Sequence, residues 1–166
     1  YTLQDVIDKG FDPLAFRLLV LQSHYRSPTN FSWDNMVAAQ NRLQELRAWA
    51  DLRWQAKSDA MTQELDELFR DTRSGIRQAL QLDLNTPAAL AVFGKLVAYM
   101  QDIAIPGAEG QYTDGTLAFL DQVFGLGLSQ RSNITDDQKQ LLADRQAARN
   151  AQDWPASDRL RLELAR

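Results

Sequence analysis

The 166-residue sequence contains no cysteine and only one histidine. A disulfide framework is therefore excluded, and cysteine and histidine ligands cannot build a zinc site within the chain. The carboxylates between Glu64 and Asp71 have the spacing of a solvated helix face. We therefore expect neither a metal ion nor a catalytic group among these residues. The lack of cysteine also fits a cytoplasmic protein.

Long apolar runs and alternating patterns are missing as well. No run approaches the roughly 18 apolar residues of a membrane-spanning helix, so we expect no membrane partner. No stretch of useful length alternates with the period of two that is typical of strands. The first residue is Tyr1 rather than methionine, which leads us to expect a piece of a longer protein.

The net charge of −4 argues against a broad surface for nucleic acid. The acidity, however, lies in one block. Residues 58–130 hold 4 lysines and arginines against 10 acidic residues, whereas residues 1–57 and 131–166 each hold 7 against 6. A small phosphate-contacting stripe at either end of the chain therefore remains open.

Apolar residues at three- and four-residue spacing predict an all-α fold. The predicted helices cover residues 3–9, 12–26, 32–57, 58–82, 88–103, 116–124, 135–151 and 154–166. Predicted helix caps are Thr2, Asp12, Ser32, Thr86 and Thr135. The glycine-rich residues 105–115 are expected to form a loop. We expect an antiparallel helical bundle over 1–130, followed over 131–166 by a helical hairpin with few large apolar residues.

The only histidine, His24, comes at the end of a strongly apolar helix and before a polar turn. Two interpretations are open. His24 can cap carbonyls or pack under the turn formed by Ser27 to Asn30, or it can contact a phosphate or a neighbouring domain. Arg17 and Arg26 flank it, but helical spacing places these two arginines on different faces.

Arginines gather again near the end of the chain. Arg145 and Arg149 are four residues apart and share one helix face, and Arg159 and Arg161 lie on the next predicted helix. A hairpin of two such helices can bind a phosphate backbone through its arginines. The alternative is that these charges only keep the helices solvated, paired with nearby aspartates and glutamates.

Four segments resemble cysteinyl-tRNA synthetase. They are D-P-L-A-F-R with H-Y-R-S-P-T-N-F-S (12–17 and 24–32), L-D-L-N-T-P (82–87), V-F-G-L-G-L (123–128) and D-W-P-A-S-D-R-L-R-L-E-L (153–164). Their order and spacing agree with the family over essentially the whole chain. The resemblance implies a helical bundle of the class I synthetase type that contacts the tRNA stem, followed by the start of a truncated, small anticodon-binding domain.

The resemblance also implies partners, which are tRNA and the parent's own catalytic domain. The residues expected to bind tRNA are Arg17, Arg26, Lys57, Arg145, Arg149, Arg159 and Arg161. The residues expected at the domain interface are His24, Ser27 and Asn30. The tRNA assignments follow from charge, and the interface assignments follow from the place of the first matching segment at the junction with the parent's catalytic domain.

In this family, the full-length parent enzyme attaches cysteine to its tRNA with ATP. The motifs of its catalytic domain, of the HIGH and KMSKS types, and its zinc-bound cysteines have no counterpart here. We therefore expect no cofactor in this chain, ATP and zinc in the parent's catalytic domain, and no activity from the chain alone. Two alternatives stay open: the C-terminal region of a mycothiol-pathway cysteine ligase, and a helical protein-interaction module.

Overall fold

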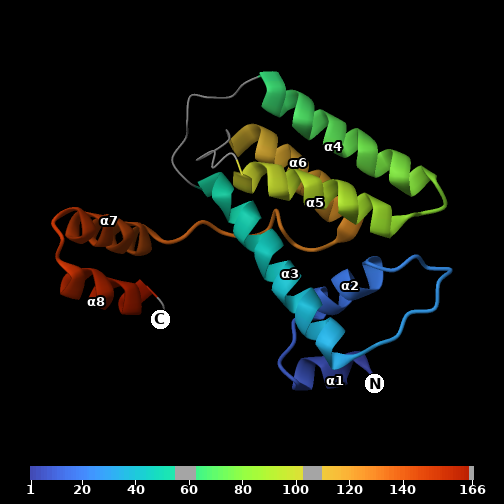
Figure 1. The fold of residues 1–166 in the computed structure, drawn as a ribbon, viewed down its shortest axis with the longest axis horizontal. Coiled ribbons are helices and arrows are strands. Elements are labelled where there is room, and N and C mark those ends of the chain that lie inside the picture. Colours follow the sequence, from blue (N-terminus) through green and yellow to red (C-terminus); the bar gives the residue numbers. More distant parts are fainter. Residues whose placement is uncertain (55–62, 103–109, 165–166) are drawn as a thin grey trace. The chain divides into compact units, whose positions relative to one another are not determined.

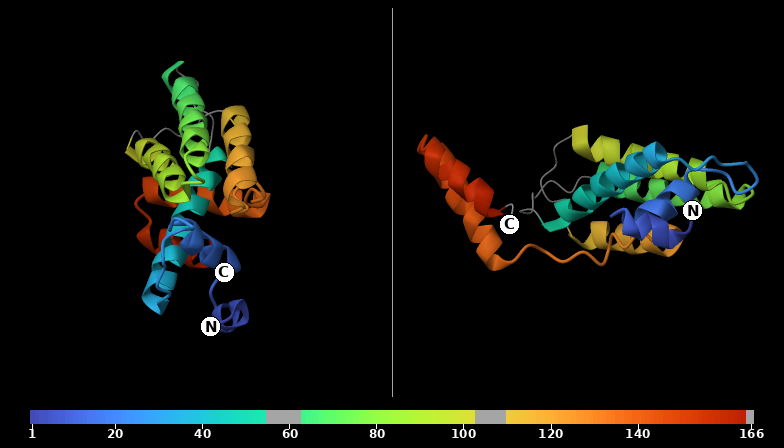
Figure 2. Two further views of the ribbon diagram at one scale, coloured as in Figure 1. Left: turned by 90° about the vertical axis from the view of Figure 1, so that its right-hand side faces the viewer. Right: turned by 90° about the horizontal axis from the view of Figure 1, so that it is seen from below.

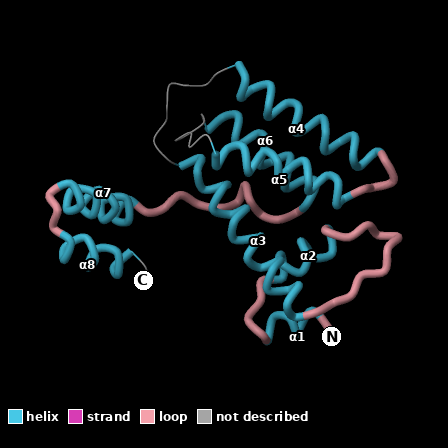
Figure 3. The backbone as a smooth tube through the Cα atoms, in the orientation of Figure 1, coloured by secondary structure: helices cyan, strands magenta, loops and turns pink. Residues whose placement is uncertain are grey.

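The computed structural model of the protein describes residues 1–54, 63–102 and 110–164 (Figure 1). Its elements are α1 (Leu3–Asp8), α2 (Pro13–Leu21), α3 (Trp33–Asp51), the 3₁₀ helix η1 (Leu52–Trp54), α4 (Gln63–Gln81), α5 (Thr86–Asp102), α6 (Gly110–Phe124), α7 (Asp136–Asn150) and α8 (Trp154–Leu164). Figure 3 draws only helices and loops along the described residues. The prediction of an all-α protein is confirmed.

The chain forms two compact units, Tyr1–Arg131 with α1 to α6 and Ser132–Arg166 with α7 and α8. In the first unit, α4 packs against α5 and α6, while α3 packs against α2 (Figure 2). The predicted stripe of α3 faces the interior, since Met36, Ala39, Leu43, Leu46 and Ala50 are all buried. Phe69, Phe93 and Leu120 join the same core from α4, α5 and α6.

The predicted capping boxes are confirmed. The Thr2 hydroxyl accepts from the Asp5 N–H, and the Asp5 carboxylate accepts from the Thr2 N–H at 2.6 Å. Thr135 and Gln138 make the same reciprocal pair at the start of α7. Each pair satisfies two backbone donors that a helix start otherwise leaves free. Because the pair lies within four neighbouring residues, these helix starts could be predicted from the sequence.

The prediction that the second helix runs to Arg26 is wrong, because α2 ends at Leu21. The Ser23 N–H bonds to the Val20 carbonyl, and the Ser27 N–H bonds to the His24 carbonyl at 2.8 Å. The chain thus leaves the helix early and closes a separate turn over residues 24–27. His24 therefore belongs to a turn rather than to the helix.

The junction of α4 and α5 differs from the prediction in its cap. The Asn85 side chain, not that of Thr86, accepts from the Ala88 N–H at 3.0 Å, so Asn85 caps α5. Before it, Asp83 and Leu84 have left-handed φ values of 57° and 51°. The N–H groups of Leu84 and Asn85 turn back onto the last carbonyls of α4, which ends that helix within a few residues.

The start of α6 also differs. The loop predicted over 105–115 is wrong for residues 110–115, which are helical, whereas residues 105–109 lie outside the described residues. Thr116 is fully buried, and its hydroxyl accepts from Arg73 of α4 at 2.9 Å. Tertiary contacts of this kind hold the helix despite glycines at both 110 and 115.

The second unit has a thin core, as predicted. Helices α7 and α8 pack against each other, but α7 has no buried residue, and Ser157 is the buried residue of α8 among those described. Leu142, Trp154 and Leu162 remain exposed. With so little apolar area removed from water, we expect this unit to be the less stable of the two.

Candidate functional site

The turn after α2 closes onto the junction between α4 and α5. The Tyr25 hydroxyl donates to Asp83 Oδ1 at 2.7 Å, and Arg26 Nη1 lies 3.2 Å from Asp83 Oδ2. The Nε–H of Arg26 also donates to the Tyr25 hydroxyl oxygen at 2.9 Å. The segments H-Y-R-S-P-T-N-F-S and L-D-L-N-T-P, far apart in sequence, therefore meet through Asp83. We name the contacts among His24, Tyr25, Arg26 and Asp83 the Asp83 clamp.

Hydrogen bonding fixes the tautomer of His24. Its Nδ1 accepts from the Arg26 N–H at 3.3 Å and so carries no proton. Its Nε2 then carries the proton and donates to the Asp83 carbonyl at 3.1 Å. The imidazole also stacks on the Tyr25 ring, with 4.9 Å between ring centroids. His24 in this form ties the turn to the junction.

The hydrogen bond to Asp83 raises the pKa of the Tyr25 phenol above its ordinary value of 10.0. The carboxylate accepts the phenolic proton, and a phenolate at the same place would face a negative charge. Tyr25 therefore acts as a neutral donor in the clamp at physiological pH.

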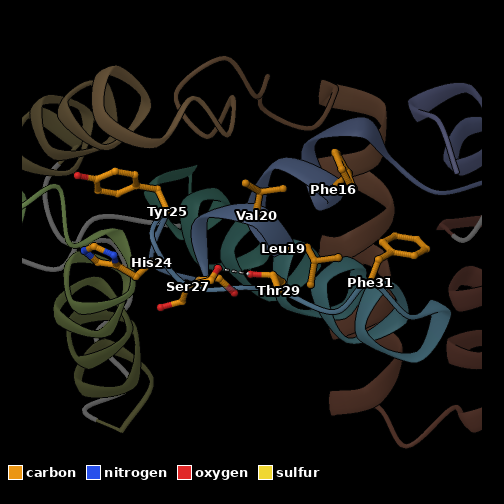
Figure 4. A pocket seen from close by; sticks show the side chains of 9 residues that line it. Phe16, Leu19, Val20, His24, Tyr25, Ser27, Thr29 and Phe31 are labelled. Atoms are coloured by element: carbon orange, nitrogen blue, oxygen red, sulfur yellow. Dashed lines mark hydrogen bonds between the residues drawn. The ribbon is translucent and has the colours of Figure 1, made fainter.

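The other two residues expected at a domain interface are both exposed: Ser27 ends the turn (Figure 4), and Asn30 lies in the loop that follows it. The Ser27 carbonyl accepts from the Thr29 hydroxyl, and the Asn30 carbonyl accepts from the Asn35 side chain at 3.4 Å. Both contacts are internal to the loop and the start of α3. The interface role of these two residues stays a prediction.

The four segments that resemble cysteinyl-tRNA synthetase are called the signature segments below. Arg17 of α2 contacts the third of them, V-F-G-L-G-L (123–128). Its Nη1 donates to the Gly125 carbonyl at 3.2 Å, just after the end of α6. A guanidinium at that position offsets the partial negative charge of the helix C-terminus. Gly125 itself has φ of 64°, and a Cβ built there would lie 2.0 Å from Arg17 Nη1. Arg17 thus links α2 to the end of α6, and its role toward tRNA stays a prediction.

Two further arginines, which the sequence analysis did not single out, organise the end of the first unit. The Arg53 side chain is 5% exposed; it pairs with Asp114 at 3.2 Å and donates to the carbonyls of Ser129 and Arg131. The Arg131 guanidinium makes two bonds to the Asp51 carboxylate, at 2.7 and 2.6 Å. This bidentate hydrogen bonding raises the pKa of Arg131.

Among the remaining candidates, Lys57 lies outside the described residues. The structure places Arg145 and Arg149 on α7, where Arg145 is half-buried and Arg149 is exposed. On α8, Arg159 and Arg161 are both exposed. Arg161 lies 3.6 Å from Asp158, whereas Arg149 and Arg159 form no ion pair with any described residue.

The residues present do not fit a zinc ion. The chain has a single histidine and no cysteine. Over the described ranges, no three histidine, cysteine or carboxylate side chains lie close enough together to hold a metal ion. In the same part of the chain, no helix is long and apolar enough to cross a membrane.

Known proteins show similarity along nearly the whole chain, although no family model matches it. The cysteine–tRNA ligase of Cyanothece sp. is 32% identical over 193 residues, covering 98% of this chain and 39% of the relative. Cysteine–tRNA ligase 1 of Burkholderia lata is 33% identical over 98% of this chain and 32% of its own length. The cysteine–tRNA ligase of Thermosynechococcus vestitus is 34% identical over 96% of this chain and 36% of its own length.

These relatives are all named as cysteine–tRNA ligases, so the class of protein that this chain resembles is that of the aminoacyl-tRNA ligases. Within this class, the chain is homologous over almost its full length to the cysteine–tRNA ligases. It spans about a third of the length of the relatives it matches.

Proposed function

We propose that this chain is the tRNA-binding region of a cysteine–tRNA ligase. The observation that carries the proposal is the similarity to cysteine–tRNA ligases over 98% of the chain. The contacts among the signature segments support it, because Arg17 with Gly125 and Tyr25 with Asp83 make these segments parts of one framework. The framework would hold the helices in a fixed arrangement on the RNA.

The proposal puts the main phosphate contacts on the second unit. In the first unit, Arg17 donates to a backbone carbonyl and Arg26 faces the Asp83 carboxylate. A phosphate approaching Arg26 would meet that negative charge, which weakens the attraction. In the second unit, Arg149 and Arg159 are exposed on neighbouring helices. Contacts of this kind read the shape and backbone of RNA rather than its bases.

The chemistry of joining cysteine to tRNA would lie elsewhere in such a ligase. Residues 1–166 offer no cluster of metal ligands among those described, and the single histidine is bonded on both ring nitrogens. ATP and zinc would be held by the part of the enzyme that this chain does not match. The contribution of this chain would be to bind and position the tRNA.

The other two functions considered from the sequence receive less support. The relatives described above bear the name of a tRNA ligase rather than of a ligase for an amino-sugar. A helical protein-interaction module without RNA would not account for this similarity. Such a module would bind a protein partner that is captured equally well before and after treatment with ribonuclease.

Titration of fluorescently labelled tRNA with the purified chain at low salt tests the proposal. We expect weak binding that weakens steeply as salt is added, since arginine–phosphate contacts release bound counterions. A control protein of equal size and net charge corrects for non-specific association. Binding no stronger than that of the control would contradict the proposal.

A further inference from the structure

The chain that leaves α6, residues 125–131, has no regular secondary structure, yet it is bound closely to the first unit. Leu126 and Leu128 are fully buried in the core of that unit. The Asp121 carboxylate of α6 accepts from the N–H groups of Leu128 and Ser129, at 2.8 and 2.7 Å. It also accepts from the Ser129 hydroxyl at 2.6 Å. These contacts fix the segment as far as Ser129.

Two arginines extend this hold to the last residue of the unit. Arg53, next to the end of α3, donates to the carbonyls of Ser129 and Arg131. The Arg53 guanidinium also lies over the Trp54 ring, 4.4 Å from its centroid. In return, the Arg131 guanidinium donates to both oxygens of the Asp51 carboxylate, at 2.7 and 2.6 Å. Each arginine thus binds the segment that carries the other. We call these contacts of Asp51, Arg53 and Arg131 the exit latch.

The hold ends directly after Arg131. Ser132, Asn133 and Ile134 form no hydrogen bond with any other described residue. Thr135 is the N-cap of α7 and so belongs to the helical part of the second unit. The division between the two compact units also falls between Arg131 and Ser132. Residues 132–134 are therefore the whole tether between a fixed segment and the next helix.

We propose that Asp51 and Arg53 are positioning residues for tRNA, because the exit latch keeps this tether short and so lets both units bind one tRNA together. This inference rests on the proposed function. A short tether raises the effective concentration of one unit at its site on the RNA once the other unit is bound. Neither residue has to touch the RNA. The Arg53 side chain is 5% exposed, and its Nη groups donate to Asp114 and to two carbonyls.

The length of the tether gives the size of the expected effect. Without the exit latch, the last fixed residue is Ser129, and the tether grows from residues 132–134 to residues 130–134. Because effective concentration falls roughly as the −3/2 power of tether length, this change lowers it about twofold. A flexible insert of twelve glycine and serine residues after Arg131 lowers it about tenfold by the same relation. With the insert in place, release of the latch adds little to an already long tether.

Titration of labelled tRNA with latch variants, made with and without this insert, tests the inference. Asp51→Ala combined with Arg53→Lys opens the latch and removes one negative charge. That change of charge by itself favours binding to RNA, so a loss of affinity cannot come from net charge. The matched control is Glu45→Ala combined with Arg42→Lys, which changes the same residue types in a surface pair of α3 with 2.8 Å between the charged atoms. Circular dichroism checks that every protein is folded.

Without the insert, we expect the latch variant to bind tRNA at least twofold more weakly than the unaltered chain, while the control variant binds as the unaltered chain does. With the insert, all three should bind equally, and about tenfold more weakly. An equal loss in the latch variant with and without the insert would show an effect on folding alone and would overturn the inference. So would an insert that leaves the affinity unchanged, or a latch variant that loses nothing.

Two further outcomes are assigned in advance. If the double latch variant does not fold, Asp51→Ala alone is compared with Glu45→Ala alone under the same criteria. If the unaltered chain binds no tRNA, the proposed function fails and this positioning role fails with it. If the unaltered chain binds tRNA but its affinity depends on neither the latch nor the insert, this inference alone is wrong. The two failures are therefore distinguishable.

Discussion

The Tyr25 hydroxyl donates a hydrogen bond to Asp83 Oδ1 at 2.7 Å and so joins residues 58 positions apart. Tyr25 follows the histidine of the first signature segment, and Asp83 is the aspartate of the second. Asp83 has a left-handed φ of 57°, as does Leu84 with 51°. Such backbone costs free energy for residues other than glycine, and the Asp83 clamp supplies bonds that offset part of that cost.

Substitution of Asp83 tests the clamp. Asp83→Asn keeps an acceptor for Tyr25 and a residue type that tolerates left-handed backbone, so we expect a loss of about 0.5 kcal/mol in the free energy of unfolding. Asp83→Ala removes the acceptor and adds backbone strain, for a loss of about 2 kcal/mol. Urea unfolding with an unchanged slope measures both. The same two substitutions at Asp71, exposed on α4, serve as controls. An Asp83→Ala effect no larger than that of Asp71→Ala would show that the clamp contributes nothing.

The raised pKa of Tyr25 predicts a dependence on alkaline pH. Because the folded-state pKa lies above the ordinary 10.0, the contribution of this group to stability is fully present below about pH 10 and is lost as the pH rises through the folded-state value. Carbon NMR of labelled tyrosines gives the pKa, with Tyr25→Phe assigning the signal. We expect a value above 10.0 that moves down toward 10.0 in Asp83→Ala, which removes the acceptor. A pKa that Asp83→Ala leaves in place would contradict the assigned cause.

Substitution of two glycines with positive φ distinguishes the cost of backbone strain from the cost of displacing Arg17. Gly10→Ala, at φ 82° with open space around it, should cost about 1 kcal/mol from backbone strain alone. Gly125→Ala, at φ 64°, carries the same strain and also displaces Arg17, so we expect an additional loss of about 1 kcal/mol. In an Arg17→Ala background this additional loss should vanish. Thermal or urea unfolding is measured for the wild type, for Gly10→Ala, Gly125→Ala and Arg17→Ala, and for each glycine variant combined with Arg17→Ala. If Gly125→Ala still costs more than Gly10→Ala when Arg17 is absent, the explanation is refuted.

Arg53 is expected to be the most sensitive arginine of the first unit. Arg53→Met leaves Asp114 and the carbonyls of Ser129 and Arg131 without their shared donor, at a cost of about 2–4 kcal/mol. Arg53→Lys keeps the charge but not the planar fork, and should lie in between. Arg42→Met removes only a pair with Glu45 on the surface of α3 and should cost less than about 0.5 kcal/mol. Equal losses at Arg53 and Arg42 in urea unfolding would contradict this ranking.

Local signals in the sequence predicted most helices and their caps, because a helix start depends on a few neighbouring residues. Thr2 with Asp5 and Thr135 with Gln138 made the bonds that their spacing indicates. The buried stripe of α3 was predicted equally well, since the apolar residues from Met36 to Ala50 recur with helical period. The start of α6 was missed because glycines at 110 and 115 favour a loop, and the contact of Thr116 with Arg73 comes from another helix.

The contacts at the candidate site could not be predicted from spacing. Arg17 meets Gly125 across 108 residues, and Arg53 meets Arg131 across 78. Helical periodicity shows which face an arginine occupies but not which segment the fold brings against that face. The resemblance to a family identified the segments that matter, whereas their meeting at Asp83 and Gly125 required the structure.

The proposed tRNA contacts are tested most directly by the salt dependence of tRNA binding in charge-matched variants. Arg149→Ala with Arg159→Ala removes two exposed arginines from the second unit, and Arg70→Ala with Arg77→Ala removes two exposed arginines from the first. We expect the first double variant to weaken binding and to reduce the slope of log K against log salt by about 2, while the second leaves the slope unchanged. Equal changes in both double variants, or no change in either, would contradict the account.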